Sequence, residues 1–378
     1  MAIVTMVCHF VKSSNAFKLF LLTFIAFLLY AFYIWKNTTT FTTITKNIYR
    51  NAEAQAKRTI DLSISFQQDV YSGNGVLSNK DPVEKHPITD DGKIYVIITF
   101  SNIKRYTELK EKFKTCISSM LSKTRTRIVF YIIGDEYSKD IAEQIMDSVC
   151  KKCHQLIHLD VNQISEKFNH IILNMLKSFT IPGHYYNDAL FFLSLIIHRV
   201  MPPYLHKVIM IDADLKFQSD INQLYRLFGE FKEGNIIGIA KELQPVYRHA
   251  FGQYRKHHPG TLVGEPPPNG FTGFNSGVLL LDLDKMRRSQ LYNSLIDSQE
   301  VFKLTEKYYF KGFLGDQDFF TLLSLEYMNV FYILPCTWNR QLCQWFRYHG
   351  YVDVFDEYFM CTGHVNIYHG NCNTSFPT

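Results

Sequence analysis

The chain has 378 residues, of which 47% are hydrophobic, 15% aromatic and 20% charged. That length and apolar content suffice for a large core and one or two domains, and the many aromatic side chains argue against extended disorder. The net charge of +5 is spread without a run of like charges, which excludes a basic tail for nucleic acid.

The first feature along the chain is an uncharged apolar stretch at 19–35, flanked on each side by a lysine. It lies at the short end of the roughly 17–25 residues of a membrane-spanning helix. A cleaved signal peptide is the alternative, but its apolar region usually has only ~7–15 residues, and no small-x-small cleavage site follows here. We therefore expect an uncleaved signal anchor, with 1–18 as cytoplasmic tail, 36–90 as lumenal stem and 91–378 as the folded domain.

The cysteine pattern agrees with an oxidising lumen. Four of the eight cysteines lie after residue 335, which predicts two disulfides of unassigned pairing. Cys150 and Cys153 have CxxC spacing, and a redox pair or half a zinc site is the alternative to ordinary disulfides. No second CxxC or finger-spaced histidine pair follows, so we expect disulfides there. Cys116, in a helical pattern, is expected to be a free buried thiol.

From Lys93 onward, apolar runs alternate with amphipathic stretches. Strands are expected at 93–100, 127–134, 156–159, 207–211, 235–240 and 276–283, and helices at 106–121, 138–149 and 186–200. This alternation indicates βαβ units, and hence an α/β fold with a Rossmann-like, mostly parallel sheet flanked by helices. The Pro/Gly-rich segment 259–273 is expected to be a long functional loop.

Two carboxylates, Asp212 and Asp214, directly follow the apolar strand at 207–211. Ligands of open α/β sheets bind beyond the carboxyl ends of such strands. Two adjacent carboxylates need a positive neighbour, for which a divalent cation is the usual solution. The motif therefore predicts a metal site and, through the metal, a phosphate-bearing substrate.

Two other interpretations of this motif were weighed. A helix N-cap is one, but Asp220 already supplies a cap for the helix that follows. A phosphohydrolase with a phosphorylated first aspartate is the other. Such enzymes want Thr or Val two residues after the second aspartate, where this chain has Lys216.

Three further motifs follow in order: Phe274-Asn275-Ser276-Gly277 at a strand edge, Gly315-Asp316-Gln317-Asp318, and His369-Gly370 near the C-terminus. Asn275, Asp316 and Gln317 offer amide and carboxylate groups suited to sugar hydroxyls. Each also has a plain structural interpretation: a turn, a helix cap by Asp316, and a structural histidine.

The order of these motifs resembles that of the retaining GT-A glycosyltransferases of family 8, the glycogenin-like group, over about residues 93–378. The C-terminal segment 334–355 and the motif His-Gly-Asn-Cys-Asn resemble the members that transfer xylose. The resemblance implies a GT-A fold and transfer of xylose from UDP-xylose, in α-1,3 linkage, to a xylosyl-glucose O-linked to EGF-like repeats.

The resemblance also implies residue roles. Asp212, Asp214 and His369 would hold a divalent metal, Mn²⁺ or alternatively Mg²⁺, on the phosphates of UDP. Asn275, Asp316 and Gln317 would be the catalytic residues at the donor sugar. Thr99, Asn102, Ala213 and Gly370 would complete the donor site. The residues expected to face the acceptor are Trp338, Asn339, Arg340, Gln341 and Trp345, with core packing around Cys336 and Cys343 as the alternative.

The resemblance implies that Gln317 occupies the position beneath the sugar ring, and a carboxamide is a poor nucleophile. We therefore expect front-face substitution, in which the leaving phosphate oxygen takes the proton of the acceptor. Many relatives carry HGxxKP, whose lysine meets the phosphates, and this chain has no lysine there. Asn371, Asn373 or a basic residue from elsewhere would have to replace it.

Three alternatives stay open at this stage. The donor could be UDP-glucose or UDP-galactose, or the chain could bind glycosylated EGF modules without transfer. The compartment could be the endoplasmic reticulum, which the resemblance favours, or the Golgi. The oligomeric state cannot be read from the sequence.

Overall fold

A computed structural model describes residues 92–150, 154–180, 188–297, 300–312 and 314–377. The tail (1–18), the anchor (19–35) and the stem (36–90) expected from the sequence lie outside the described residues. Within the described ranges, no helix combines the length and the apolar character needed to cross a membrane.

A seven-stranded sheet forms the centre of the fold, in the order β3-β2-β1-β4-β7-β6-β8. Only β7 runs antiparallel to its neighbours, so the expected mostly parallel sheet is confirmed. Its strands are β1 (Lys93–Thr99), β2 (Arg127–Gly134), β3 (His154–Asp160), β4 (Lys207–Ile211), β6 (Ile237–Lys241), β7 (Phe274–Asp282) and β8 (Phe331–Leu334).

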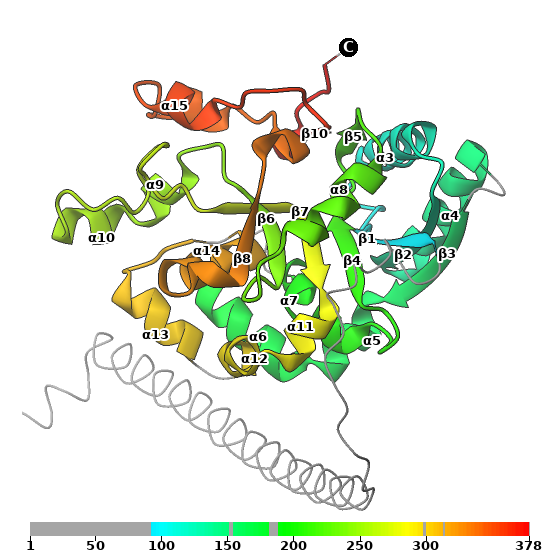
Figure 1. Ribbon diagram of the computed structural model, residues 1–378, viewed down its shortest axis with the longest axis horizontal. Helices are drawn as coiled ribbons and strands as arrows, with labels where there is room; N and C mark the ends of the chain where they lie inside the picture. Colours follow the sequence, from blue (N-terminus) through cyan, green and yellow to red (C-terminus); the bar gives the residue numbers. More distant parts are fainter. Residues whose placement is uncertain (1–91, 151–153, 181–187, 298–299, 313, 378) are drawn as a thin grey trace, which may run out of the picture. The chain divides into compact units, whose positions relative to one another are not determined.

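Helices cover both faces of this sheet (Figure 1). Strand β1 shows why: Ile94, Val96 and Ile98 enter one buried apolar cluster, and Ile97 enters the other. The first cluster is completed by α3 (Leu109–Lys123), α4 (Glu136–Cys150) and α8 (Ile221–Arg226). The second is completed by α5 (Val161–Lys167), α6 (Asn169–Phe179), α7 (Leu193–Val200), α11 (Leu283–Arg288), α12 (Gln290–Asp297), α13 (Glu300–Lys307) and α14 (Asp316–Glu326). Alternate side chains of a strand point to opposite faces, so strands buried on both faces read as continuous apolar runs.

A second, three-stranded sheet has the order β5-β10-β9. It joins β5 (Leu215–Phe217), which directly follows the Asp212-Ala213-Asp214 motif, to β9 (Arg340–Gln341) and β10 (Ile367–His369). This small sheet brings the C-terminal end of the chain back to the carboxyl end of β4. The short helices α9 (Val246–Ala250), α10 (Gly252–His257) and α15 (Phe355–Phe359) complete the described α-helices.

The cysteine expectations are confirmed where the structure describes them. Cys336 pairs with Cys361 and Cys343 with Cys372. Cys116 is buried and free on α3, and Cys150 is disulfide-bonded, while Cys153 lies outside the described residues. The segment 259–273 is irregular apart from an isolated bridge between Val263 and Phe271, as expected for a loop.

Candidate functional site

A cavity of about 820 Å³ opens at one edge of the main sheet. Strands β1, β4 and β6 end there, and the antiparallel β7 begins there, so all four deliver polar residues to one place. The N-terminus of α14 and the end of β10 complete the walls. This edge is where open α/β sheets bind ligands, and the volume lies in the usual range of small-molecule sites.

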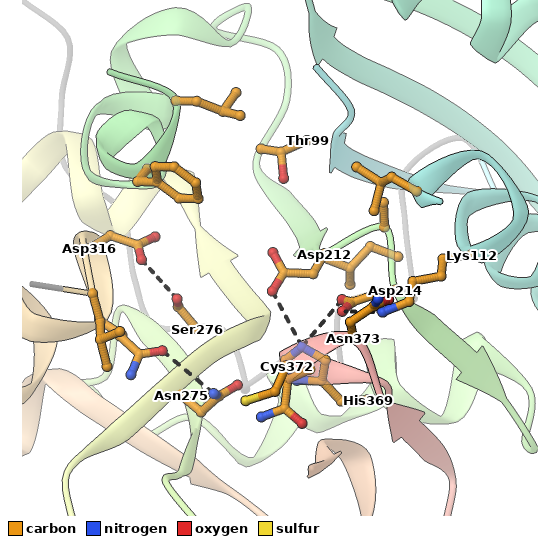
Figure 2. A pocket seen from close by; sticks show the side chains of 18 of the residues that line it. Thr99, Lys112, Asp212, Asp214, Asn275, Ser276, Asp316, His369, Cys372 and Asn373 are labelled. Carbon is orange, nitrogen blue, oxygen red and sulfur yellow. Dashed lines mark hydrogen bonds and ion pairs between the residues drawn. The ribbon is translucent and has the colours of Figure 1, made fainter. Parts of the chain in front are cut away.

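On one wall, the expected metal ligands come together (Figure 2). His369 Nε2 lies 3.5 Å from Asp212 Oδ2 and 3.3 Å from Asp214 Oδ1. The His369 side chain is buried, while that of Asp212 is 47% exposed toward the cavity. One ligand atom from each of the three residues lies within 4.8 Å of the others, a spacing that a single cation can bridge.

The electrostatics of this triad favour a bound cation. Loss of water and the nearby Asp214 carboxylate raise the pKa of Asp212 to about 6, against the opposing effect of His369. Desolvation disfavours the His369 imidazolium, but Asp214 and Asp212 together raise its pKa. Without a metal, His369 supplies the charge that the aspartates need. Two carboxylates and an imidazole form a mixed oxygen and nitrogen ligand set that suits Mn²⁺ better than Ca²⁺.

The backbone around His369 explains the Asn-Ser-Gly motif. A Cβ atom placed on Gly277 would lie 2.3 Å from His369 Cε1, so only glycine lets the imidazole reach the aspartates. The Gly277 carbonyl also accepts a hydrogen bond from the Asp212 amide at 3.0 Å. The glycine therefore has a packing role at the site in addition to forming part of β7.

The same cavity carries the groups expected at the donor sugar. Asn275 Nδ2 lies 3.1 Å from Glu242 Oε2 and 3.5 Å from Gln317 Oε1. Gln317 Nε2 donates to the Tyr247 hydroxyl at 3.2 Å, and this hydroxyl donates to Asp318 at 2.9 Å. These bonds fix both carboxamides before any ligand binds.

Asp316 does not cap its helix, contrary to the structural alternative, because α14 begins at Asp316 itself and Gly315 holds the cap position. Instead, the Asp316 carboxylate accepts hydrogen bonds from the hydroxyls of Ser194 and Ser276, the latter at 2.8 Å. Burial raises the pKa of Asp316 to about 7 against the effect of both hydroxyls. The residue lines the cavity, as its expected role requires.

Thr99, Asn102 and Ala213 also line the cavity. Asn102, just after β1, has a positive φ of 60°. Its backbone amide donates to Asp135 at 2.7 Å, which holds this turn beside the cavity. Gly370 lies behind the triad, where its amide donates to the Asp214 carbonyl at 2.8 Å.

Of the residues expected to face the acceptor, only Trp345 lines the cavity, with half of its side chain exposed. Trp338 packs in the apolar core, which matches the core-packing alternative. Asn339 and Gln341 are fully buried, and their side chains form hydrogen bonds within the protein. Arg340 packs over the Phe359 ring at 4.0 Å.

Several lining residues were not predicted from the sequence, and two of them, Glu242 and Lys112, contact the predicted residues Asn275 and Asp214. Glu242 follows β6, is buried, and has no hydrogen-bond partner for Oε1. Burial raises its pKa to about 7 although Asn275 acts against this. Lys112, on α3, lies beside Asp214. Both come from segments without a recognisable motif, and only the position of Glu242 directly after an apolar strand could have drawn attention to it.

Comparisons with known proteins agree with this site. A sequence model described as glycosyl transferase family 8 matches residues 99–351. Mouse xyloside xylosyltransferase 1 is 42% identical over 293 residues, which cover 75% of this chain and 74% of the mouse protein. The human protein of the same name is 43% identical over the same shares.

The fold agrees as well. The crystal structure of mouse xyloside xylosyltransferase 1 in its apo form matches with a TM-score of 0.72 at 42% identity, covering 75% of this chain and 100% of that one. The match therefore extends over most of the domain that contains the cavity. The chain belongs to glycosyltransferase family 8 and is a glycosyltransferase.

Proposed function

We propose that the protein is a retaining, UDP-xylose-dependent α-1,3-xylosyltransferase that extends a xylosyl-glucose O-linked to EGF-like repeats. One observation carries the proposal: the cluster of Asp212, Asp214 and His369 lines the same cavity as Asn275 and Gln317. A pyrophosphate bound at the cluster would place the sugar beside these two carboxamides. The names of the mouse and human relatives support xylose as the transferred sugar.

Asp212, Asp214 and His369 would hold the metal, which we propose to be Mn²⁺, with Mg²⁺ as the alternative. When bound, it stabilises the negative charge that develops on the departing UDP. Thr99, Asn102 and Ala213 line the cavity on the side of β1 and β4, where we place the nucleotide. Asn275, Asp316 and Gln317 would orient the xylose through its hydroxyls.

Retention of configuration follows most simply from front-face substitution. The bond from C1 to the phosphate oxygen breaks, the acceptor oxygen bonds to C1 on the same face, and its proton passes to the departing phosphate. A double displacement would need an ionised nucleophile. Gln317 carries no charge, and Glu242, whose pKa burial raises to about 7, has its carboxyl held by the Asn275 amide at 3.1 Å. A glycosyl adduct trapped on any side chain would overturn this mechanism.

The acceptor side of the cavity suits a protein-borne sugar. Trp345 lies at the cavity, and Tyr348, Val352 and Met360 in the same C-terminal region are exposed apolar side chains. A tryptophan can stack on a sugar ring, and neighbouring apolar groups can contact the module that carries it. This supports a glycosylated EGF-like repeat as the partner.

We place the catalytic domain in the lumen of the endoplasmic reticulum, anchored as a single-pass type II membrane protein by 19–35, with the Golgi as the alternative. The two C-terminal disulfides support an oxidising compartment.

The test offers a xylosyl-glucose EGF-like repeat with UDP-xylose, UDP-glucose and UDP-galactose in turn, in the presence of Mn²⁺. We expect transfer from UDP-xylose to exceed the others. Equal or faster transfer from UDP-glucose would contradict the donor assignment.

The Asp212→Asn variant should lose at least ~10²-fold in activity, by analogy with loss of one electrostatic stabiliser. Unchanged transfer by this variant would show that Asp212 is not needed for the reaction, and the exposed Asp140→Asn variant is the matched control.

A further inference from the structure

We propose that Lys112 binds the pyrophosphate of the donor and supplies the positive charge that the C-terminal motif lacks. This inference rests on the proposed use of a nucleoside diphosphate sugar. Lys112 lies on α3, 258 positions before Gly370 in the sequence, yet the two residues are in contact. Lys112 Nζ donates to the Gly370 carbonyl at 2.9 Å. Its charge therefore lies directly beside the His-Gly motif.

The ammonium group of Lys112 lies close to the triad of Asp212, Asp214 and His369. Lys112 Nζ lies 3.6 Å from Asp214 Oδ2, and Figure 2 shows it beside this carboxylate at the cavity wall. Asp214 is one of the three residues that would hold the metal. A phosphate bound to that metal would come within a few ångströms of Nζ, where two opposite charges attract strongly in a site of reduced hydration.

The hydrogen-bonding capacity of Lys112 is not exhausted. An ammonium group has three donors, and the Gly370 carbonyl takes one of them. The contact with Asp214, at 3.6 Å, is an ion pair longer than a hydrogen bond. The side chain is 16% exposed and lines the cavity, so a ligand can reach the remaining donors.

The charge balance points the same way. A divalent cation matches the two aspartates, and His369 as a ligand is neutral. Lys112 then leaves this cluster of four residues and its cation with one net positive charge, which a pyrophosphate neutralises. The other candidates are weaker. Asn371 and Asn373 carry no charge, and Asn371 Oδ1 already accepts from the amides of Leu342 and Cys343. Arg105 lines the cavity, but it is exposed and lies over the Tyr106 ring.

The experiment measures binding rather than turnover. The full chain, its Lys112→Met variant and its Lys114→Met variant are titrated with UDP and with uridine by calorimetry at saturating Mn²⁺. Lys114 is exposed on the same helix and serves as the matched control. We expect Lys112→Met to weaken UDP binding about ten- to a hundredfold, the range for loss of a hydrogen bond to a charged group, and to leave uridine binding unchanged.

Two results would overturn the inference. Lys112→Met could bind UDP as tightly as the Lys114→Met control, as expected of a lysine that only neutralises Asp214. It could also weaken UDP and uridine equally, as a general structural role predicts. Failure of the unaltered protein to bind UDP with Mn²⁺ would instead overturn the proposed donor, which keeps the two failures distinct.

Discussion

At the residue scale, the orientation of His369 depends on Asn339. Asn339 Nδ2 donates to Asn275 Oδ1 at 2.8 Å, so Asn339 Oδ1 faces His369 Nδ1 at 2.9 Å and must accept its proton. This assignment leaves Nε2 as the nitrogen directed at Asp212 and Asp214. A metal-binding histidine usually has such a partner, which fixes its tautomer and ring orientation. The buried Asn339 is therefore a positioning residue for the metal site rather than an acceptor contact.

We predict that Asn339→Ala weakens Mn²⁺ affinity by about tenfold or more, the usual effect of removing such a partner. Titration of the protein with Mn²⁺, followed by the electron paramagnetic resonance of free Mn²⁺, measures the change. The control is Asn366→Ala, because Asn366 bonds to Thr337 and Ser219 and does not contact His369. Equal Mn²⁺ affinity of the two variants would refute the role of Asn339.

Glu242 leads to a prediction about pH. Burial raises its pKa from 4.5 to about 7, so the folded protein holds this proton more tightly than the unfolded chain does. Such a group favours folding below about pH 4.5, and this contribution is lost as the pH rises through about 7. Glu242→Gln cannot ionise. As the pH rises from about 4.5 to about 7, the free energy of unfolding of this variant should therefore increase by about 2–3 kcal/mol relative to that of the unaltered protein.

Denaturant unfolding of both proteins at pH 5 and pH 8, in the presence of a chelator, checks this. The chelator is needed because a bound metal would change the charge near Glu242. A stability difference that stays constant between the two pH values would show that Glu242 ionises normally in the folded protein.

At the element scale, the sequence predicted the strands with long apolar runs better than the other elements, and it did not predict β5, β8, β9 or β10. The strands at 127–134 and 207–211 have the expected bounds because continuous apolar runs buried on both faces end abruptly at polar residues. The helix expected at 186–200 begins in the described residues as a 3₁₀ turn at Ala189–Phe192, followed by α7. Periodicity does not distinguish these two helical forms.

The candidate site shows the same division. Asp212, Asp214, Asn275, Gln317 and His369 were predicted because they lie in short motifs whose order resembles that of family 8. Lys112 and Glu242 were not, since their place in the cavity depends on how distant segments pack. The contact between Lys112 and Gly370 exists only once the C-terminal strand β10 pairs with β5 beside α3.

The small sheet that carries His369 is tied covalently by the Cys343–Cys372 disulfide, three residues beyond the histidine. We predict that replacing both cysteines by serine lowers the free energy of unfolding by about 3–4 kcal/mol, from the closure of a loop of 29 residues. It should also weaken Mn²⁺ binding, because the end of β10 loses its anchor.

The other C-terminal disulfide provides the control. Cys336–Cys361 closes a loop of similar length, 25 residues, but neither cysteine adjoins a metal ligand. Its removal should lower stability to a similar extent and leave Mn²⁺ affinity unchanged. Unfolding in urea and Mn²⁺ titration of both double variants separate the two effects, and equal Mn²⁺ affinities would contradict the link between Cys343–Cys372 and the site.

At the scale of the whole molecule, the core and the site are separate. The two apolar clusters fill both faces of the main sheet, whereas the triad lies at the edge where the strands end. Polar residues gather at that edge, and three carboxyls there have raised pKa values: the buried Glu242 and Asp318 and the half-buried Asp316. The apolar core therefore stabilises the fold. This stability offsets the cost of holding charged groups in a fixed arrangement at the edge of the sheet.

This separation predicts the outcome of metal removal. With a chelator, we expect the protein to stay folded and to unfold cooperatively, because no core contact depends on a cation, but transfer should stop. Mn²⁺ and UDP at about 100 times the dissociation constant should add about 2.7 kcal/mol and raise the unfolding temperature by about 4–5 °C. Calorimetric scans with chelator, with Mn²⁺ alone and with Mn²⁺ plus UDP test this. Loss of the cooperative transition in chelator would mean that the metal maintains the fold, and the separation of core from site would then be wrong.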